Sequence, residues 1–331
     1  MMLGLILSLC IASFLIAFIG TPSWIRRARE SGFVREDAHK KGKPEVPEMG
    51  GVAVILGAMF SVLIYVAFDT FLFEKENVKL VLAALTSITL AFAIGMVDDM
   101  LGGIIGLKRY EKALLTLLVP IPLMVVNAGV SSMIFPFLGE VDLGLLYPLV
   151  VIPVIVIGAT NGFNLLRGYN GLEASMGIII LSVLGWLALE TGGIAAAIIS
   201  FAFVSALLAF LFYNRYPARV FPGSVLTYSI GAAISVVAIL GNLERFAAML
   251  FFIFFIDLFL KARVHFKQEQ RVKVLEDGSL SVDGVYSIPH LVIRFLTRVK
   301  GRAYENEVVA TILGFQIIIA GLVIGNFYRI F

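Results

Sequence analysis

The chain has 331 residues, of which 60% are hydrophobic and only 15% charged, and its mean hydropathy is +0.97. Soluble domains carry about 25% charged residues, so this composition excludes an ordinary soluble protein. A transmembrane β-barrel is also excluded, because its segments are short and alternating, whereas the apolar segments here are long and continuous. The single cysteine, Cys10, excludes a disulfide within the chain. The net charge of +3 gives no reason to expect a nucleic-acid partner.

Ten apolar segments follow one another along the chain, each near the roughly 20 residues that a helix needs to cross a bilayer. They cover 2–21, 50–69, 79–97, 112–129, 144–161, 172–190, 193–213, 225–241, 246–263 and 305–327. The first is predicted to be a retained helix, because Arg26, Arg27 and Arg29 follow it in place of a small-residue cleavage site. Backbone polar groups inside a bilayer must be satisfied within the segment. The predicted fold is therefore an all-α polytopic membrane protein with about ten transmembrane helices.

The basic residues predict the orientation of the chain. The loops at 21–49, 98–112, 161–171, 214–224 and 264–304, with the adjoining helix ends, hold 22 of the 26 Lys and Arg. Because such residues accumulate on the cytoplasmic side, these loops are predicted to be cytoplasmic and both termini extracytoplasmic. The chain has no convincing long internal repeat. Residues 1–331 are thus predicted to form a single integral membrane domain with a larger cytoplasmic loop at about 264–304.

Two adjacent carboxylates, Asp98 and Asp99, end the third predicted helix on its cytoplasmic side. Desolvating them is costly, and the dipole at a helix C-terminus disfavours negative charge. We therefore expect a divalent cation, a retained proton or a nearby lysine such as Lys112 to offset their charge. The alternative is a solvated helix terminus that faces the basic loop.

The next cytoplasmic loop is rich in asparagine and glycine. On a helix, Asn161 and Asn164 share a face. Amide oxygens can ligate a hard cation such as Mg²⁺, and amide groups can recognise a base or a sugar. Gly168 and Gly171 would let the backbone approach a ligand closely. A Gly/Asn-rich turn between two helices is the alternative interpretation.

The stretch 213–224 combines aromatic, basic and proline residues. Arg219 could bind phosphate, and Phe221 could stack on a planar base. Ser224 is placed to cap the following helix. The alternative is a rigid re-entry loop with an interfacial aromatic belt.

Two further features lie near the C-terminus. His290, Arg294 and Arg298 recur at a spacing of four, which predicts one helical face suited to a pyrophosphate or an anionic lipid head group. An amphipathic helix at the membrane surface is the alternative. Asp257 lies inside an apolar segment, where an acid indicates a functional role. Lys261 is about one turn away, so an intrahelical ion pair near the interface is the alternative.

In this order, these stretches resemble the polyprenyl-phosphate N-acetylhexosamine-1-phosphate transferase family, whose members move a sugar-1-phosphate from a UDP-sugar to a membrane lipid phosphate. The motifs lie at 47–51, 98–99, 161–164, 168–174 and 213–221, and more loosely at 290–298. The sequence Asn-Gly-Leu-Glu-Ala at 170–174 resembles the eukaryotic and archaeal branch. That branch implies transfer of GlcNAc-1-phosphate from UDP-GlcNAc to dolichyl (polyprenyl) phosphate, with release of UMP. This is the first step of lipid-linked oligosaccharide synthesis for N-glycosylation.

The resemblance also implies roles for individual positions. Asp98, Asp99 and Lys112 would be catalytic. Asn164 and Asp99 would ligate Mg²⁺, with Mn²⁺ as an alternative, together with position 224. The substrates would be bound by Glu48, Asn161, Asn170, Glu173, Arg219, Phe221, His290, Arg294 and Arg298. The Ile/Val-rich, cysteine-poor composition favours an archaeon, so the expected location is the cell membrane, or the endoplasmic reticulum in a eukaryote. The active site would lie on the cytoplasmic face.

Three positions depart from the family pattern. Ser224 stands where an aspartate normally ligates the metal, and serine is a poor Mg²⁺ ligand compared with carboxylate. Arg167 places a bulky cation where relatives have a small or acidic residue, and Ser175 replaces a usual glycine. We expect weakened Mg²⁺ affinity and low turnover, unless another acid such as Glu173 helps to hold the metal.

Two other functions stay open at this point. A lipid or sugar transporter fits ten helices and Asp257, but it predicts polar residues at the bilayer midplane, whereas here they lie at the cytoplasmic ends. A catalytically impaired lipid-binding homologue fits the serine at position 224. The expected partners are UDP-GlcNAc, the lipid phosphate and the bilayer, and a homodimer is a further candidate.

Overall fold

The computed structural model describes residues 2–72, 77–101, 108–135, 139–266 and 272–330, so parts of the predicted loops at 98–112 and 264–304 lie outside the described residues. Its helices are α1 (Met2–Glu30), α2 (Gly51–Phe71), α3 (Val78–Leu101), α4 (Arg109–Thr116), α5 (Ile121–Val125), α6 (Ile152–Leu165), α7 (Leu172–Glu190), α8 (Ile194–Asn214), α9 (Gly223–Leu240), α10 (Glu244–Leu250), α11 (Phe252–Arg263), α12 (Ile288–Lys300) and α13 (Glu305–Ile330). A π-helical turn, η1 (Tyr147–Val151), leads directly into α6.

Three antiparallel hairpins, which the apolar pattern did not predict, join the helices. They pair β1 (Val34–Glu36) with β2 (Glu45–Pro47), β3 (Ser132–Phe135) with β4 (Gly139–Asp142), and β5 (Val272–Val274) with β6 (Leu280–Val282). In the first hairpin Val34 lies opposite Pro47, which brings the chain back to the start of α2.

The prediction of a helical membrane protein is confirmed. In the described part of the chain, eight helical segments are long and apolar enough to cross a bilayer. The predicted segments 112–129 and 246–263 are instead each built from two short helices, α4 with α5 and α10 with α11. Pro120 immediately precedes α5, and a proline has no N–H to continue a helical ladder. The second break falls at Phe251, between α10 and α11.

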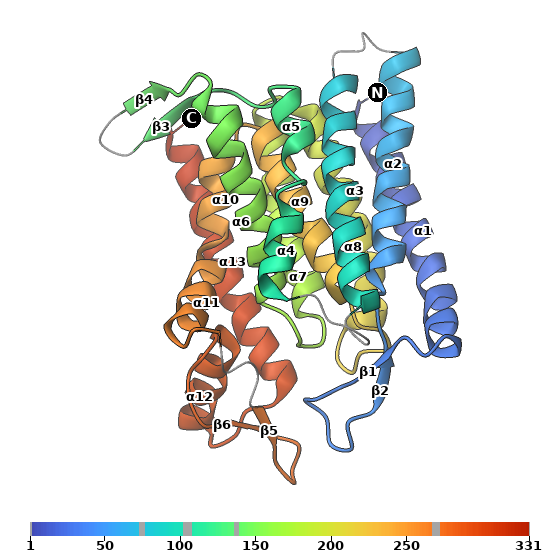
Figure 1. Cartoon of the computed structure of the whole chain (residues 1–331), viewed down its shortest axis with the longest axis vertical. Helices are drawn as coiled ribbons and strands as arrows, with labels where there is room; N and C mark the ends of the chain where they lie inside the picture. Colours follow the sequence, from blue (N-terminus) through green and yellow to red (C-terminus); the bar gives the residue numbers. More distant parts are fainter. Residues whose placement is uncertain (1, 73–76, 102–107, 136–138, 267–271, 331) are drawn as a thin grey trace.

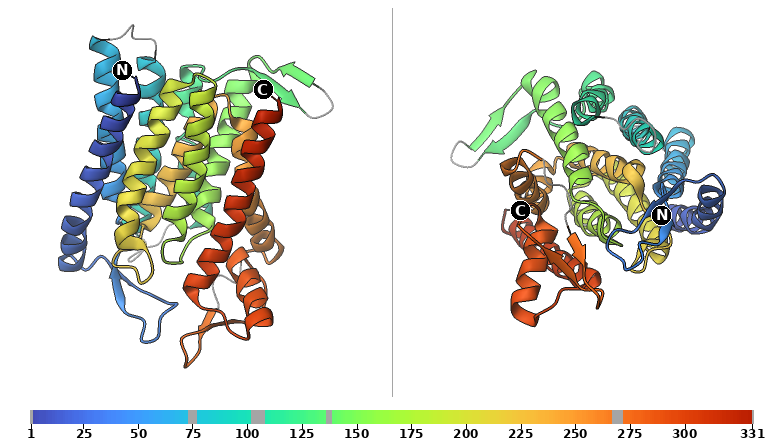
Figure 2. Two further views of the ribbon diagram at one scale, coloured as in Figure 1. Left: turned by 180° about the vertical axis from the view of Figure 1, so that it is seen from behind. Right: turned by 60° about the horizontal axis from the view of Figure 1, so that its bottom comes forward.

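The core of the bundle is α9. Every residue from Gly223 to Ile239 is buried, and α9 contacts α2, α3, α6, α7, α8 and α10 (Figure 2). Glycines allow this close packing, because they let helix backbones approach one another. A Cβ on Gly95 of α3 would lie 2.6 Å from the Cα of Val225, and one on Gly231 would lie 2.5 Å from the carbonyl oxygen of Ala159. The start of α9 is thereby held against the end of α3, where the two aspartates lie.

The two ends of the molecule differ in character (Figure 1). The β1–β2 hairpin, the β5–β6 hairpin and α12 lie at the lower end. The start of α1, the end of α13 and the β3–β4 hairpin lie at the upper end. Both ends of the chain are thus on the side away from the loops that carry the predicted site residues.

Candidate functional site

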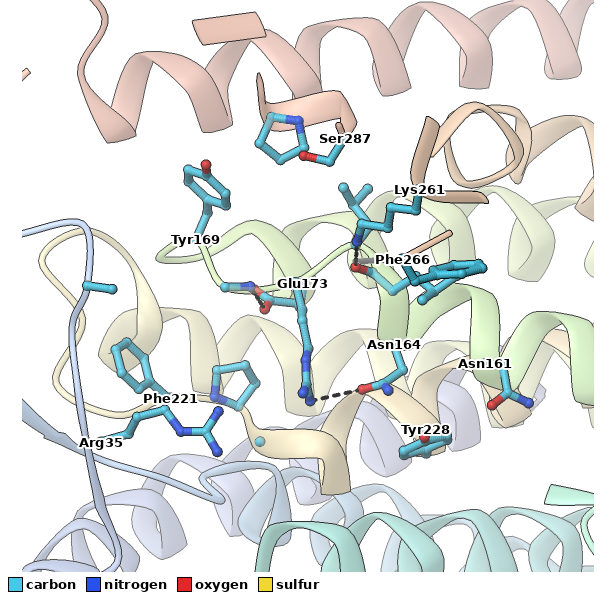
Figure 3. Close-up of a pocket in the computed structure, with 18 of the residues that line it drawn as sticks. Arg35, Asn161, Asn164, Tyr169, Glu173, Phe221, Tyr228, Lys261, Phe266 and Ser287 are labelled. Carbon is cyan, nitrogen blue, oxygen red and sulfur yellow. Dashed lines mark hydrogen bonds between the residues drawn. The ribbon is translucent and has the colours of Figure 1, made fainter. Parts of the chain in front are cut away.

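A cavity of ≈ 720 Å³ is lined by residues from segments such as β1 and α12, which lie at the lower end of the molecule in Figure 1. Its walls come from β1, α4, α6, α7, α11, α12 and the loop before α9, as Figure 3 shows in part. Seven of the predicted site residues line it: Glu48, Lys112, Asn161, Asn164, Glu173, Phe221 and His290. Stretches that are far apart in the sequence therefore meet around one space.

Asp98 lies behind this wall, and it is 4% exposed. Its Oδ1 is 2.6 Å from the ammonium of Lys112, and its Oδ2 accepts a hydrogen bond of 2.7 Å from the Ser224 hydroxyl. The expected offset of the aspartate charge by a lysine is thus present. Because Lys112 also lines the cavity, the buried carboxylate fixes a cation at the cavity wall.

Asp99 is held by the start of α9. Its two carboxylate oxygens accept hydrogen bonds from the backbone N–H groups of Ser224 at 2.7 Å and Val225 at 2.9 Å. Negative charge is favourable at a helix N-terminus, so α9 compensates for the unfavourable C-terminal end of α3. The preceding residue has to be glycine: Gly223 has a φ of +75°, and a Cβ there would lie 2.4 Å from Asp99 Oδ2.

Arg167 joins the two other predicted metal-binding positions. Its Nη1 donates to the side-chain oxygen of Asn164 at 3.1 Å and to the Ser224 hydroxyl at 2.7 Å. The dashed line that ends on Asn164 in Figure 3 marks the first of these bonds. The Asn164 oxygen also has Thr227 Oγ1 at 2.8 Å as a second donor. Arg167 lines the cavity itself.

This arrangement does not fit a divalent cation. Mg²⁺ needs near-octahedral oxygen ligands at about 2.0–2.1 Å. The oxygens of Asn164, Asp99 and Ser224 each already accept hydrogen bonds, and a guanidinium lies between two of the three. The serine hydroxyl is neutral and donates to Asp98. The predicted ligands are thus brought together around Arg167.

Glu48 and Arg35 form an ion pair of 3.1 Å at another part of the wall. Burial raises the pKa of the Glu48 carboxyl to about 7, even though Arg35 opposes the shift. Glu48 therefore changes its charge near neutral pH, at a position facing the cavity.

Two predicted site residues on α6 and α7 hold local structure. Asn161 donates to Thr116 Oγ1 at 2.9 Å and to the Ile157 carbonyl at 3.0 Å. Glu173 Oε1 accepts from the N–H of Gly168 at 2.7 Å. The other oxygen, Oε2, is buried and has no hydrogen-bond partner among the residues that the structure describes.

Asn170 lies outside the cavity wall, where it ties four segments together. Its backbone N–H donates to Glu305 at 2.7 Å, and its side-chain amide donates to Asp37 at 3.2 Å. Its side-chain oxygen accepts from the N–H of Ala218 at 2.6 Å and from Lys40 at 3.2 Å. The contact with uracil that the family resemblance implies stays a prediction.

His39 packs beside this cluster, with its ring 4.3 Å from that of Tyr169. Burial lowers the pKa of His39 to about 4, so the imidazole is neutral at pH 7. Asp37, His39 and Glu305 place potential metal-ligating atoms within 4.8 Å of one another. Lys40, however, already forms ion pairs with both acids.

The C-terminal basic residues divide between two environments. His290 is buried and lines the cavity, and burial lowers its pKa. Arg294 and Arg298 are exposed and outside the cavity wall, as is Arg219. A spacing of four drifts by about 40° per step on a helix, so three such residues need not share one environment. Their roles stay predictions. The ion pair of Asp257 with Lys261, the alternative interpretation of this acid, is present at 3.0 Å.

Comparison with known proteins places the chain in a family. A profile of glycosyl transferase family 4 matches residues 81–242. A protein of Saccharolobus solfataricus that carries the name UDP-N-acetylglucosamine–dolichyl-phosphate N-acetylglucosaminephosphotransferase is 34% identical, over 93% of this chain and 92% of its own length. The chain belongs to glycosyl transferase family 4. A protein of Sulfolobus acidocaldarius with the same name is 32% identical, over 98% of this chain and 96% of its own length. The phospho-N-acetylmuramoyl-pentapeptide-transferase of Halalkalibacterium halodurans is 33% identical, over 71% of this chain and 74% of its own length.

The site of this glycosyl transferase family 4 member includes residues that sequence reasoning did not assign to it. Arg35, His39, Tyr228 and Lys261 also line the cavity. His39, as one of only three histidines, offered a signal by its rarity. Lys261 was assigned to an ion pair, but its ammonium also donates to the carbonyl of Leu165 at the end of α6 (Figure 3).

Proposed function

We propose that the chain transfers GlcNAc-1-phosphate from UDP-GlcNAc to dolichyl (polyprenyl) phosphate and releases UMP. One structural observation carries this proposal: two cations, Lys112 and Arg167, are fixed on the cavity wall by contacts with buried polar groups. Relatives whose names state this reaction match nearly the whole chain. They give no support to the transporter alternative.

The reaction joins two anions, so charge repulsion is its main obstacle. An oxygen of the lipid phosphate attacks the β-phosphorus of the UDP-sugar, and a new phosphorus–oxygen bond forms. The bond between the β-phosphorus and the bridging oxygen breaks, and UMP leaves with that electron pair. Lys112 and Arg167 would donate hydrogen bonds to the diphosphate oxygens and stabilise the charge that develops on them, and fixed donors of this kind need no reorganisation during the reaction. Phe221 lines the cavity, and its ring would stack on the base.

The orientation of the chain belongs to the same proposal. With α4–α5 and α10–α11 each counted as one crossing, the chain crosses the membrane ten times. Both termini are then extracytoplasmic and the cavity opens to the cytoplasm, where UDP-sugars are made. The support is the charge asymmetry of the loops. In addition, both chain ends lie at the end of the molecule opposite the β1–β2 hairpin and α12, whose residues line the cavity (Figure 2). In an archaeal cell, this membrane is the cell membrane. A homodimer stays a prediction.

The test is transfer by the purified full-length chain. UDP-GlcNAc labelled in the sugar is incubated with dolichyl phosphate, and lipid extraction should recover label together with an equal amount of UMP. UDP-glucose serves as the control nucleotide sugar. Binding of both substrates without product would support the catalytically impaired homologue instead.

A further inference from the structure

We propose that the guanidinium of Arg167 takes the place of the divalent cation, so that this chain carries the required positive charge as a side chain. The inference rests on the proposed function for its chemistry. Its geometric basis is independent: the guanidinium lies between Asn164 and Ser224, two of the three positions predicted to ligate the metal.

Arg167 is anchored through one nitrogen. Nη1 has two hydrogens, and these match the two acceptors at 3.1 Å and 2.7 Å. Among the residues that the structure describes, Nε and Nη2 have no hydrogen bond to a protein acceptor. Arg167 lines the cavity, so these remaining N–H groups are available to a ligand. A planar pair of donors suits the oxygens of a phosphate.

The charges at this site balance without a metal. Asp98 pairs with Lys112 at 2.6 Å, and Asp99 is held by two backbone N–H groups. Arg167 adds a second positive charge to the two carboxylates. A serine at position 224 is what this arrangement needs, because its hydroxyl accepts from Arg167 while it donates to Asp98. An aspartate there would add a third buried carboxylate, which a monovalent guanidinium would not neutralise.

Arg167 and Ser224 therefore depart from the family pattern together, and each departure compensates for the charge effect of the other. A carboxylate and a divalent cation together contribute a net charge of +1, and so does a serine with an arginine. The proposal thus replaces the expectation of impaired turnover from Ser224 alone.

The first test measures metal binding without substrate. Mn²⁺ is titrated into the detergent-solubilised full-length chain, and bound metal is followed by electron paramagnetic resonance. The wild-type chain should show no saturable site, whereas the double variant Arg167→Ala with Ser224→Asp should gain one Mn²⁺ per chain. Saturable binding by the wild type that is lost in Ser224→Ala would overturn the proposal. So would a folded double variant that binds no Mn²⁺.

The second test measures transfer of labelled GlcNAc-1-phosphate with and without excess EDTA. The wild-type rate should be the same in both, and the Arg167→Ala rate should be lower by about 10²–10³-fold, the usual effect of removing a charge-stabilising group. The double variant should become active only with Mg²⁺. Loss of wild-type activity in EDTA, with recovery on adding Mg²⁺, would overturn the proposal.

Matched variants separate the guanidinium from general effects. Arg167→Lys keeps the positive charge but loses the planar pair of N–H donors. Its rate should therefore lie between those of the wild type and Arg167→Ala. Arg27→Ala removes an exposed arginine of α1 and should leave the rate unchanged. If no form of the chain makes product under any metal condition, the proposed function fails, and the Mn²⁺ titration alone then decides this inference.

Discussion

Lys112 faces the cavity because Asp98 holds it there. The carboxylate is buried, and its second oxygen is occupied by Ser224, so the pair has little freedom to rearrange. Such a pair is expensive to break, since loss of one partner leaves the other charge poorly compensated. The aspartate therefore acts by positioning the lysine.

Replacing this carboxylate tests its role. Asp98→Asn should lower kcat by about 10²-fold, because Lys112 loses the charge that holds it against the wall. The rate is measured as labelled lipid formed at saturating UDP-GlcNAc. Asp142→Asn, in the exposed β4 strand at the other end of the molecule, should keep the wild-type rate. Equal product from Asp98→Asn and the wild type would refute this site assignment.

Glu48 predicts a pH dependence of substrate binding. Its pKa is raised to about 7 by burial, so the carboxyl is neutral below that pH and anionic above it. Since the UDP-sugar is anionic and Glu48 lines the cavity, the KM for UDP-GlcNAc should increase as the pH rises through 7. Glu48→Gln should remove this increase. His39, with a pKa lowered to about 4, does not titrate in that window. The pH range from about 6 to about 8 brackets the pKa of Glu48. A wild-type KM for UDP-GlcNAc that stays constant across this range would count against the role of Glu48 in substrate binding.

The same group affects stability with a defined sign. The fold raises the pKa of Glu48 from 4.5 to about 7, so it favours the neutral carboxyl. Its contribution to the free energy of unfolding is fully present below the unfolded value of 4.5 and is lost as the pH rises through about 7.

At the scale of helices, the contact between α3 and α9 places the aspartates. Gly95→Ala should lower the free energy of unfolding by about 1–3 kcal/mol, because its Cβ would overlap the backbone of α9. The matched control is Gly158→Ala in α6, where a Cβ would meet nothing within 4 Å. That change should leave the thermal midpoint in detergent unchanged or raise it, since alanine is the better helix former. Equal midpoints for the two variants would contradict the packing account.

The long helices could be predicted because bilayer-spanning segments have a strong apolar signal. The range 172–190 matches α7 at both ends, and 193–213 matches α8 within one residue. The breaks at Pro120 and Phe251 were missed because hydropathy does not report local backbone geometry. The hairpins were missed because their strands have only three or four residues each.

The residues of the site could be predicted only in part, since seven of the predicted site residues line the cavity and others lie outside it. The polar motifs at helix ends indicated which segments meet. Charge alone left a divalent cation, a retained proton and a nearby lysine open as the partner of the aspartates, and the structure shows Lys112 against Asp98. The position of Arg167 between Asn164 and Ser224 depends on how the loop leaves α6, which no sequence pattern encodes. The cluster around Asn170 joins residues more than 100 positions apart and is equally invisible to spacing.

At the scale of the whole molecule, the account requires the cavity to face the cytoplasm. Single cysteines are introduced by Lys41→Cys, in the loop between β1 and β2, and by Glu140→Cys, in β4, on a Cys10→Ser background. Both positions are exposed. In sealed right-side-out vesicles, a membrane-impermeant maleimide should label position 140 and should reach position 41 only after lysis. The opposite labelling pattern would reverse the proposed orientation.

The central claim is that the β-phosphorus moves together with the sugar. The most direct measurement uses UDP-GlcNAc labelled with ³²P in the β-phosphate, incubated with dolichyl phosphate and the full-length chain. All transferred label should enter the lipid fraction, and the released nucleotide should be unlabelled UMP. Label retained in UDP, with sugar alone on the lipid, would contradict it, as would the absence of any labelled lipid.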